Sequence, residues 1–474
     1  MSESGVGKTL IIGAGPAGLV AGLELSKNNH PSIIIESQAQ VGGISRTIKH
    51  NDNFYDFGPH RFFTKETVVK DLWHDTLGSD FLKCPRLTRI YFNNKFFYYP
   101  LKALNAFFGL GVISSISIFL SYLVARLKYY LNPKKEVKNF EEWVSQRFGK
   151  KLFNIFFKTY TEKVWGISTS KIGADWAAQR IKGLSLFKAV KDAIFTPKQK
   201  LTTLIDEFNY PRLGAGMMYE KIAENYQARG GELKLNSKIT EIIHEDSIIK
   251  SVKSNDGIVY KADNLISSMP LTNFVKSLSP KAPQEIIEAA DSLRFRTMVI
   301  VYLTIDKEDI FPDNWIYIHS PEVKVGRITN FKNWSKDMIS NQLKTTLAME
   351  YFCFESDEVW KMDQEAIVNF AKEELEKMNL AKKEKITESF SYKMKYVYPV
   401  YDLEYKNYLN KILNYLKNFS NLQLVGRNGI FRYNNMDHSV LTGLYAARNI
   451  LGESHDIFSI NTDDDYHEIK KEKK

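Results

Sequence analysis

The chain has 474 residues, of which 44% are hydrophobic and 25% are charged, and its formal net charge is +10. A chain of this size predicts about three domains, and the positive charge favours an anionic ligand or a membrane surface as a partner. No basic block with interleaved aromatic residues stands out, so nucleic acid is not an expected partner. Cys84 and Cys353 are the only cysteines, which speaks against a disulfide framework and predicts a reducing, cytoplasmic location.

Residues 10–36 (LIIGAGPAGLVAGLELSKNNHPSIIIE) predict a buried strand, a glycine-rich turn, a helix and a second buried strand. Gly13, Gly15 and Gly18 follow the first strand at the spacing G-x-G-x-x-G. We expect Gly13 to permit a tight turn, Gly15 to let the backbone approach a pyrophosphate, and Gly18 to let the helix pack on the strand. Because the glycines stand between a strand and a helix, the pattern predicts a dinucleotide site rather than a plain glycine-rich turn.

The acid at the end of the second strand, Glu36, can accept a hydrogen bond from a ribose hydroxyl. Ala17 lies in the first turn of the predicted helix, whose N-terminus attracts phosphate. Shortly afterwards, in QVGGISRT, Gly42 and Gly43 can pass close to a ligand and Arg46 can meet diphosphate charge. A glycine pair at this place resembles the second motif of FAD enzymes in the amine oxidase and protoporphyrinogen oxidase superfamily. The resemblance implies FAD as the cofactor.

The stretch 54–64, FYDFGPHRFFT, is similar to a segment of the UDP-galactopyranose mutase branch of that superfamily. The resemblance implies that His60 lies against the flavin ring, although a lone histidine also has a purely structural interpretation. Arg61 and Phe63 depart from the mutase pattern. Residues 86–101, RLTRIYFNNKFFYYPL, predict two strands around an Asn-Asn turn.

Residues 103–125 contain no charged residue and are numerous enough to span a bilayer. Frequent Ser, Gly and Asn argue against a span, and so do the basic residues on both sides of the stretch. A crossing would also separate the first glycine motif from the C-terminal motif of the same site. We therefore expect a buried helix pair in a substrate domain, with peripheral contact between 103–125 and a membrane as the alternative.

Residues 139–165 show apolar residues at helical spacing after Asn139, a helix-capping residue. NFEEWV, FGKKLF and TYTEKVW resemble the mutase helical domain, which implies that Trp165 or Tyr160 holds a substrate base. Tyr160 has a second interpretation as a core residue. Arg180 is the arginine carried over for substrate binding, whereas Leu184 stands near the family's diphosphate-binding arginine.

The middle of the chain supplies further segments that are similar to the superfamily in their order. They are PRLGAGMMY, the strands around 230–242, where Ile239 corresponds to an adenine contact, and ADNLISSMP. Residues 293–304 alternate as a sheet strand does. Asp291 replaces a second phosphate-binding arginine of the mutases, and Arg294 and Arg296 are near enough in sequence to compensate for it.

The last motif, 424–452, begins with a strand and Gly426-Arg427 and continues into a long helix. This order resembles the FAD-closing motif of the superfamily, with Met436 and Asp437 at the helix N-terminus, near reduced flavin. RYNNMD matches the mutase pattern at Tyr433, Met436 and Asp437. Upstream, YPVYDLEY offers Tyr398 or Tyr401 to line the site, although either residue also has a packing interpretation.

Together these segments predict an α/β fold: a discontinuous, GR2-type Rossmann-like FAD-binding domain with a helical and a mixed-sheet substrate domain. The FAD-binding segments are predicted at 1–90, 206–275 and 401–452. The helical domain is predicted at 91–205, the sheet-bearing domain at 276–400 and a charged tail at 453–474.

The resemblance implies an FAD-dependent oxidoreductase that acts on a sugar or isoprenoid-linked small molecule through flavin N5, with His60, Tyr433 and Arg427 as catalytic residues and no metal. The alternative is a mutase-like sugar ring isomerase in polysaccharide biosynthesis, in which reduced FAD acts on a nucleotide sugar without net redox change. A structural flavin-binding protein is a third interpretation, disfavoured by the Tyr, Trp and His constellation.

Overall fold

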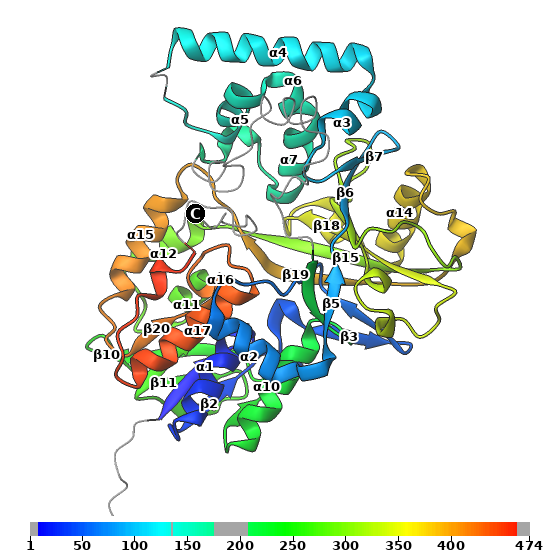
Figure 1. The fold of residues 1–474 in the computed structure, drawn as a ribbon. Coiled ribbons are helices and arrows are strands. Elements are labelled where there is room, and N and C mark those ends of the chain that lie inside the picture. The colour runs from blue at the N-terminus through cyan, green and yellow to red at the C-terminus, as the bar shows by residue number, and fades with distance from the viewer. Residues whose placement is uncertain (1–7, 134–135, 175–206, 462–474) are drawn as a thin grey trace, which may run out of the picture.

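The computed structural model describes residues 8–133, 136–174 and 207–461 (Figure 1). Its strands form a five-stranded, a four-stranded and a seven-stranded sheet and two small ribbons. This combination of a parallel sheet with mixed and antiparallel sheets confirms the predicted α/β class. The predicted domain bounds remain a prediction.

The five-stranded sheet is entirely parallel and is assembled from distant parts of the chain. Its first two strands are apolar runs that are buried, as strands covered on both faces are. In spatial order the strands are β20 (Leu422–Leu424), β13 (Asn264–Ser267), β1 (Thr9–Ile12), β2 (Ser32–Ile35) and β9 (Glu232–Lys234).

Three helices lie together beside this sheet: α1 (Pro16–Lys27), α10 (Gly216–Ala228) and α17 (Met436–Ile450). A Cβ atom on Gly443 would lie 2.0 Å from the carbonyl oxygen of Ala17, so α17 packs directly on the backbone of α1. The helix α2 (Thr67–Leu77) packs against α10 and α17. The first and last motifs of the chain are thereby neighbours in space.

The four-stranded sheet adjoins the first sheet through a shared apolar cluster. Its strands are β12 (Val259–Lys261), β11 (Ile248–Ser254), β10 (Ile239–Glu245) and β14 (Leu278–Ser279). The helices around it are α11 (Leu271–Lys276), α12 (Gln284–Ser292) and α15 (Tyr405–Leu416).

The seven-stranded sheet carries a further hydrophobic core. It includes the predicted hairpin of 86–101, whose Asn93 and Asn94 have φ of +49° and +57°, as a tight hairpin turn requires. Its strands in order are β19 (Ile386–Pro399), β15 (Phe295–Ile305), β18 (Thr345–Cys353), β17 (Arg327–Asn330), β16 (Trp315–Ile318), β6 (Thr88–Phe92) and β7 (Lys95–Tyr98). Its accompanying helices are α13 (Glu358–Lys361) and α14 (Gln364–Lys377). The two ribbons pair β3 (Thr47–His50) with β4 (Asn53–Asp56) and β5 (Phe81–Pro85) with β8 (Glu207–Pro211).

A group of helices stands beyond the seven-stranded sheet, at the top of Figure 1. Asn139 accepts a hydrogen bond from the backbone N–H of Glu142, so the expected helix cap is present. Gly149, with φ of +83°, separates the first two helices of the expected 139–165 block. The helices are α3 (Ala103–Leu110), α4 (Val112–Leu131), α5 (Phe140–Phe148), α6 (Lys150–Phe153) and α7 (Thr159–Trp165), with a π-helical segment, Asn154–Lys158, before the last.

The apolar stretch 103–125 does form two helices, α3 and α4, but the expectation that they are buried is wrong. Ile118 is the only buried residue of α4, and most of its apolar side chains are exposed. Apolar composition alone does not distinguish a core helix from one that turns an apolar side outward. Among the described residues, α4 is also the one helix that is long and apolar enough to cross a membrane.

Candidate active site

The two glycine motifs of the N-terminal segment meet at the carboxyl end of β1. Gly13 has φ of +98°, and a Cβ atom on Gly18 would lie 1.9 Å from the Gly13 carbonyl oxygen. These contacts confirm the expected tight turn and the close approach of α1. Gly15 has φ of −78°, which any residue can adopt, but its α-carbon faces Gly43, where an added Cβ would come within 3.2 Å of it. Gly15 and Gly43 therefore let the two backbone segments approach each other without side chains between them, and we call this place the glycine cradle.

Glu36 ties this cradle to the second strand. Its carboxylate is buried and accepts hydrogen bonds from the backbone N–H of Ala14, at 2.7 Å, and of Gln38, at 2.9 Å. The carboxylate is thus held at the mouth of the first turn, where the ribose contact is predicted. Charge-assisted bonds of this kind fix an acceptor in place.

Arg46 follows the glycine pair Gly42-Gly43, and its side chain turns toward the protein. Its Nη1 donates to the carbonyl oxygen of Gly43 at 3.0 Å, and its guanidinium lies 4.3 Å from the centre of the Phe57 ring. Burial lowers the pKa of this guanidinium. Arg46 therefore fixes the loop that carries Gly42 and Gly43, while its predicted contact with diphosphate stays a prediction.

The C-terminal motif closes the site from the other side. Gly426 has φ of +73°, and a Cβ atom there would lie 3.4 Å from the Cβ of Ala17. Arg427 donates to the carbonyl oxygens of Asn434 and Val397 at 2.7–3.0 Å. Its guanidinium thereby shapes the loop that leads to Met436, the first residue of α17.

The helix α17 begins where the sequence predicts, with a reciprocal cap between Asn435 and His438. Met436 and Asp437 stand in its first turn, where the helix dipole favours negative charge. Ile239, the predicted adenine contact, is buried at the start of β10. These positions agree with the expected arrangement, and the individual contacts with a cofactor remain predictions.

A cavity of about 160 Å³ lies between the C-terminal motif and the seven-stranded sheet. It brings together five residues that the sequence predicts for the site: His60, Tyr398, Arg427, Tyr433 and Met436. It also contains residues that the sequence does not single out for the site, among them Arg327, Trp315 and Tyr317 on neighbouring strands, and Arg61. No Asp or Glu belongs to the described lining of this cavity.

The cavity is electropositive around a neutral histidine. Burial, followed by the charges of Arg427 and Arg327, lowers the pKa of His60 to about 3. Arg327 forms an ion pair with Glu350, which is completely buried. The guanidinium of Arg61 lies 5.1 Å from the centre of the Trp315 ring. Since His60 is uncharged near neutral pH, it can donate or accept a hydrogen bond without adding charge.

Aromatic rings form one wall of the site, and α7 contributes to it. The Trp165 ring lies 6.0 Å from Tyr398, 5.9 Å from Tyr401 and 6.3 Å from Tyr433, measured between ring centres. Tyr160 instead packs behind Tyr317, at 5.2 Å, and stacks on His319 at 4.9 Å. Trp165 is thus next to two cavity residues, while Tyr160 supports the wall from behind.

The predicted substitutes for the mutase arginines do not reach the cavity. Arg296 donates to the carbonyl oxygens of Val164 and Lys163 and so holds the end of α7. Arg294 pairs with Asp402, and Asp291 pairs with Lys276 on the exposed side of α12. The suggestion that Arg294 and Arg296 compensate is therefore not supported by their contacts. Arg180 and Leu184 lie outside the described residues.

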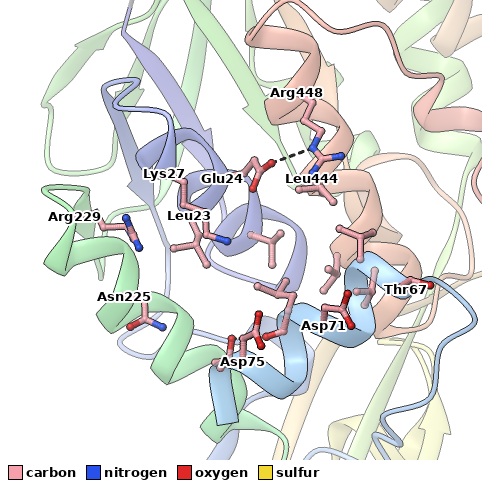
Figure 2. A pocket seen from close by; sticks show the side chains of 16 residues that line it. Leu23, Glu24, Lys27, Thr67, Asp71, Asp75, Asn225, Arg229, Leu444 and Arg448 are labelled. Carbon is pink, nitrogen blue, oxygen red and sulfur yellow. Dashed lines mark hydrogen bonds and ion pairs between the residues drawn. The ribbon is translucent and has the colours of Figure 1, made fainter. Parts of the chain in front are cut away.

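A larger groove, of about 760 Å³, lies between α1, α2, α10 and α17 (Figure 2). Charged side chains such as Asp71, Asp75 and Arg229 surround it, and Glu24 pairs with Arg448 at 3.0 Å. The groove shares no residue with the cavity around His60, and its sides are the outer surfaces of packed helices. Size alone does not make it the active site, since the glycine cradle and the converging polar groups lie elsewhere.

The fold and these motifs define a dinucleotide-binding flavoprotein. The chain belongs to the family of flavin-containing amine oxidoreductases, whose model matches residues 16–451. The cofactor is FAD, and the glycine cradle is a fitting site for its pyrophosphate because Gly15 and Gly43 face each other there through backbone atoms.

Solved structures share the fold. Reduced UDP-galactopyranose mutase superposes with a TM-score of 0.85 at 20% identity, covering 97% of both chains. A putative protoporphyrinogen oxidase from Exiguobacterium superposes with a TM-score of 0.72 at 14% identity, over 95% of this chain and 100% of the other.

Curated relatives match over part of their length. A 4,4'-diapophytoene desaturase from Methylomonas is 24% identical over 63% of this chain and 61% of its own. A probable UDP-galactopyranose mutase from Klebsiella pneumoniae is 25% identical over 46% of this chain and 53% of its own. The chain thus spans little more than half the length of these relatives.

The first prediction concerns the cradle. The variant Gly15→Asp should lose FAD, because its carboxylate would stand against the pyrophosphate in the gap toward Gly43. Flavin absorbance per mole of purified protein measures this, and circular dichroism reports folding. The control Ala228→Asp adds the same charge at an exposed helix end and should keep full occupancy. Wild-type FAD content in Gly15→Asp would show that the cofactor lies elsewhere.

The second prediction concerns the buried His319 behind the aromatic wall. Burial lowers the pKa of His319 from 6.5 to about 3, so the unfolded chain binds a proton below pH 6.5 that the folded chain does not. Its contribution to stability is complete above pH 6.5 and is lost as the pH falls. Between pH 7 and pH 5 this amounts to about 2 kcal/mol.

Urea unfolding at the two pH values tests this. The variant His319→Gln cannot titrate, so its free energy of unfolding should fall less from pH 7 to pH 5 than that of the wild type. The control His74→Gln alters a histidine on the exposed side of α2 and should follow the wild-type slope. Equal slopes for His319→Gln and the wild type would contradict the prediction.

Proposed function

We propose that this protein is an FAD-dependent oxidoreductase that acts on a small, anionic, sugar- or isoprenoid-linked substrate. The observation that carries the proposal is the cavity with His60, Arg61, Arg327 and Arg427 and no described acidic residue in its lining. FAD, when bound, supplies a hydride acceptor at flavin N5. The residues of the chain bind and orient the substrate beside it.

The arginines of the cavity favour an anionic group on the substrate. The charge of Arg327 is matched by Glu350, and Arg427 is committed to backbone carbonyl oxygens. Arg61 lines the same cavity and adds a third guanidinium to it. Its place over Trp315 also lets an anion bind beside an aromatic surface.

Neutral His60 and the tyrosines give the site its hydrogen-bonding groups. Burial raises the pKa of Tyr398 to about 12, so its hydroxyl stays protonated and can donate. Together with Trp165, these rings form an aromatic wall on one side of the cavity. A positively charged cavity stabilises negative charge that develops on a substrate or on reduced flavin.

The second candidate is a sugar ring isomerase that uses reduced FAD without net redox change. The observation in its favour is the likeness in fold to reduced UDP-galactopyranose mutase over 97% of the chain. Against it stand Asp291 on the surface and the inward-turned Arg296, so that neither residue replaces the second of the diphosphate-binding arginines. A role in polysaccharide biosynthesis belongs to this candidate.

The third prediction separates the two candidates by their need for an electron acceptor. An oxidoreductase returns its flavin to the starting state only by passing electrons on, so steady turnover should stop when the acceptor is withdrawn. The assay supplies FAD-loaded enzyme with UDP-sugars and isoprenoid phosphates, with oxygen and with a dye acceptor in parallel. The matched arm uses dithionite-reduced enzyme under anaerobic conditions without acceptor. Many turnovers of a UDP-sugar to its ring isomer in that arm would replace the first candidate by the second.

The fourth prediction concerns Arg61 as the substrate's anion partner. A lost charge-assisted hydrogen bond costs about 1.5–3 kcal/mol, so Arg61→Gln should raise KM about 10- to 100-fold. We expect kcat to change less, because the group binds the substrate before and during reaction alike. Arg61→Lys should restore part of the affinity. A fall in kcat with unchanged KM would instead assign Arg61 to the chemical step.

A further inference from the structure

The pair of helices α3 and α4 turns a continuous apolar side outward. Of the 23 large apolar side chains that are exposed in the described residues, 14 lie between Leu104 and Leu131. Along α4 they recur every three or four residues, so they share one side of the helix. We name this the apolar face, and its central residues are Ile113, Ile116, Leu120, Leu123, Leu127 and Leu131.

The opposite side of α4 is fixed to the protein. Ile118 is buried, and α4 packs on α5 and α6. A Cβ atom on Gly149 would lie 2.8 Å from the backbone of Ser121 and Tyr122, and the Lys151 N–H donates to the Ser121 hydroxyl. The helix α4 is long and apolar enough to span a membrane. Because it lies lengthwise along the outer edge of the molecule (Figure 1), however, it is placed to lie flat on a surface.

The same region carries positive charge only. Residues 81–133 contain seven Lys or Arg and no Asp or Glu. Lys102 precedes α3, and Arg126 and Lys128 stand in the last turns of α4, so basic groups flank the apolar face at both ends. The Arg126 guanidinium lies 5.4 Å and 5.3 Å from the ring centres of Tyr129 and Tyr130. Tyrosines beside basic residues are typical of the bilayer interface.

We propose that the apolar face of α3 and α4 is a docking surface for an anionic lipid bilayer, on which the protein rests without crossing it. The apolar side chains enter the acyl boundary, and Lys102, Arg126 and Lys128 meet the phosphate groups. This inference does not depend on the proposed chemistry of the FAD site.

A second copy of the chain fits this face less well. A two-fold interface sets the same patch against itself, and a patch with basic residues at both ends and no acidic residue has no opposite charges with which to meet its copy. An anionic bilayer supplies negative charge along the whole face. The charge distribution thus selects lipid over self-association.

The fifth prediction tests the face by flotation of the FAD-loaded, full-length protein with vesicles. The vesicles contain phosphatidylcholine and phosphatidylglycerol in roughly a 2:1 ratio, at about 50 mM salt so that charge is little screened. The wild type should float with these vesicles, and with pure phosphatidylcholine vesicles much less. The double variant Ile113→Glu/Leu120→Glu should bind these vesicles at least about tenfold more weakly than the wild type.

The matched control is Leu343→Glu, which adds a charge at an apolar residue far along the chain from the face. Leu343 is 69% exposed, which lies between the exposed fractions of Ile113 (87%) and Leu120 (55%). The control should float as the wild type does. All three proteins should keep FAD and the same unfolding temperature, since none of the altered side chains is buried. Lys102→Glu/Lys128→Glu should reduce flotation with anionic vesicles specifically.

Three outcomes would overturn the proposal. The first is no flotation of the wild type with anionic vesicles at low salt. The second is an equal loss in Leu343→Glu, which would assign binding to general surface properties. The third is that light scattering shows a dimer for the wild type and a monomer for the double variant, while neither protein binds vesicles. That result would make the face an interface between copies of the chain.

Discussion

Backbone-to-backbone packing at positions without side chains holds this molecule together around its cofactor site. Gly18 rests on the Gly13 carbonyl, Gly43 faces Gly15, and Gly443 rests on Ala17. The last two contacts join segments that are apart in the sequence, in the case of Gly443 and Ala17 by more than four hundred residues. A methyl group at Gly18 or Gly443 would overlap a carbonyl oxygen, so these contacts tolerate no larger residue without movement of a helix. The parallel sheet beneath can form around a dinucleotide only because its covering elements approach this closely.

The cavity beside that cradle depends on a different balance, between buried charge and compensation. Glu350 is completely buried and Arg327 is 14% exposed, and each charge would be costly alone, whereas paired they are tolerated. Their pairing leaves the cavity with arginine charge that is not cancelled by an acid in its described lining. That excess lowers the pKa of His60 further than burial alone. The neutral histidine therefore has two causes, burial first and arginine charge second, and it shares the second with the electropositive cavity.

The sequence predicts the cradle well because its determinants are local. Glycine spacing, strand pattern and terminal acid all lie within 10–36, and the structure confirms the turn, the helix and both strands. Arg327 could not be found in this way, since it is an ordinary strand residue whose partner Glu350 lies on the neighbouring strand. The roles of Arg294 and Arg296 were equally beyond local reasoning, because sequence proximity to Asp291 says nothing about which way a guanidinium turns.

The apolar stretch 103–125 shows the same limit from the opposite direction. Its composition fits a core helix, a membrane span and a surface helix alike, and the hydrophobic period of α4 does not say which side of the helix meets the protein. The elements that pack against the helix determine which side is buried. Here Gly149 and α5 pack against the side of α4 around Ile118. The same helical group ends in α7, which brings Trp165 to the wall of the cavity. One packed group of helices thus carries both the apolar face and part of the site.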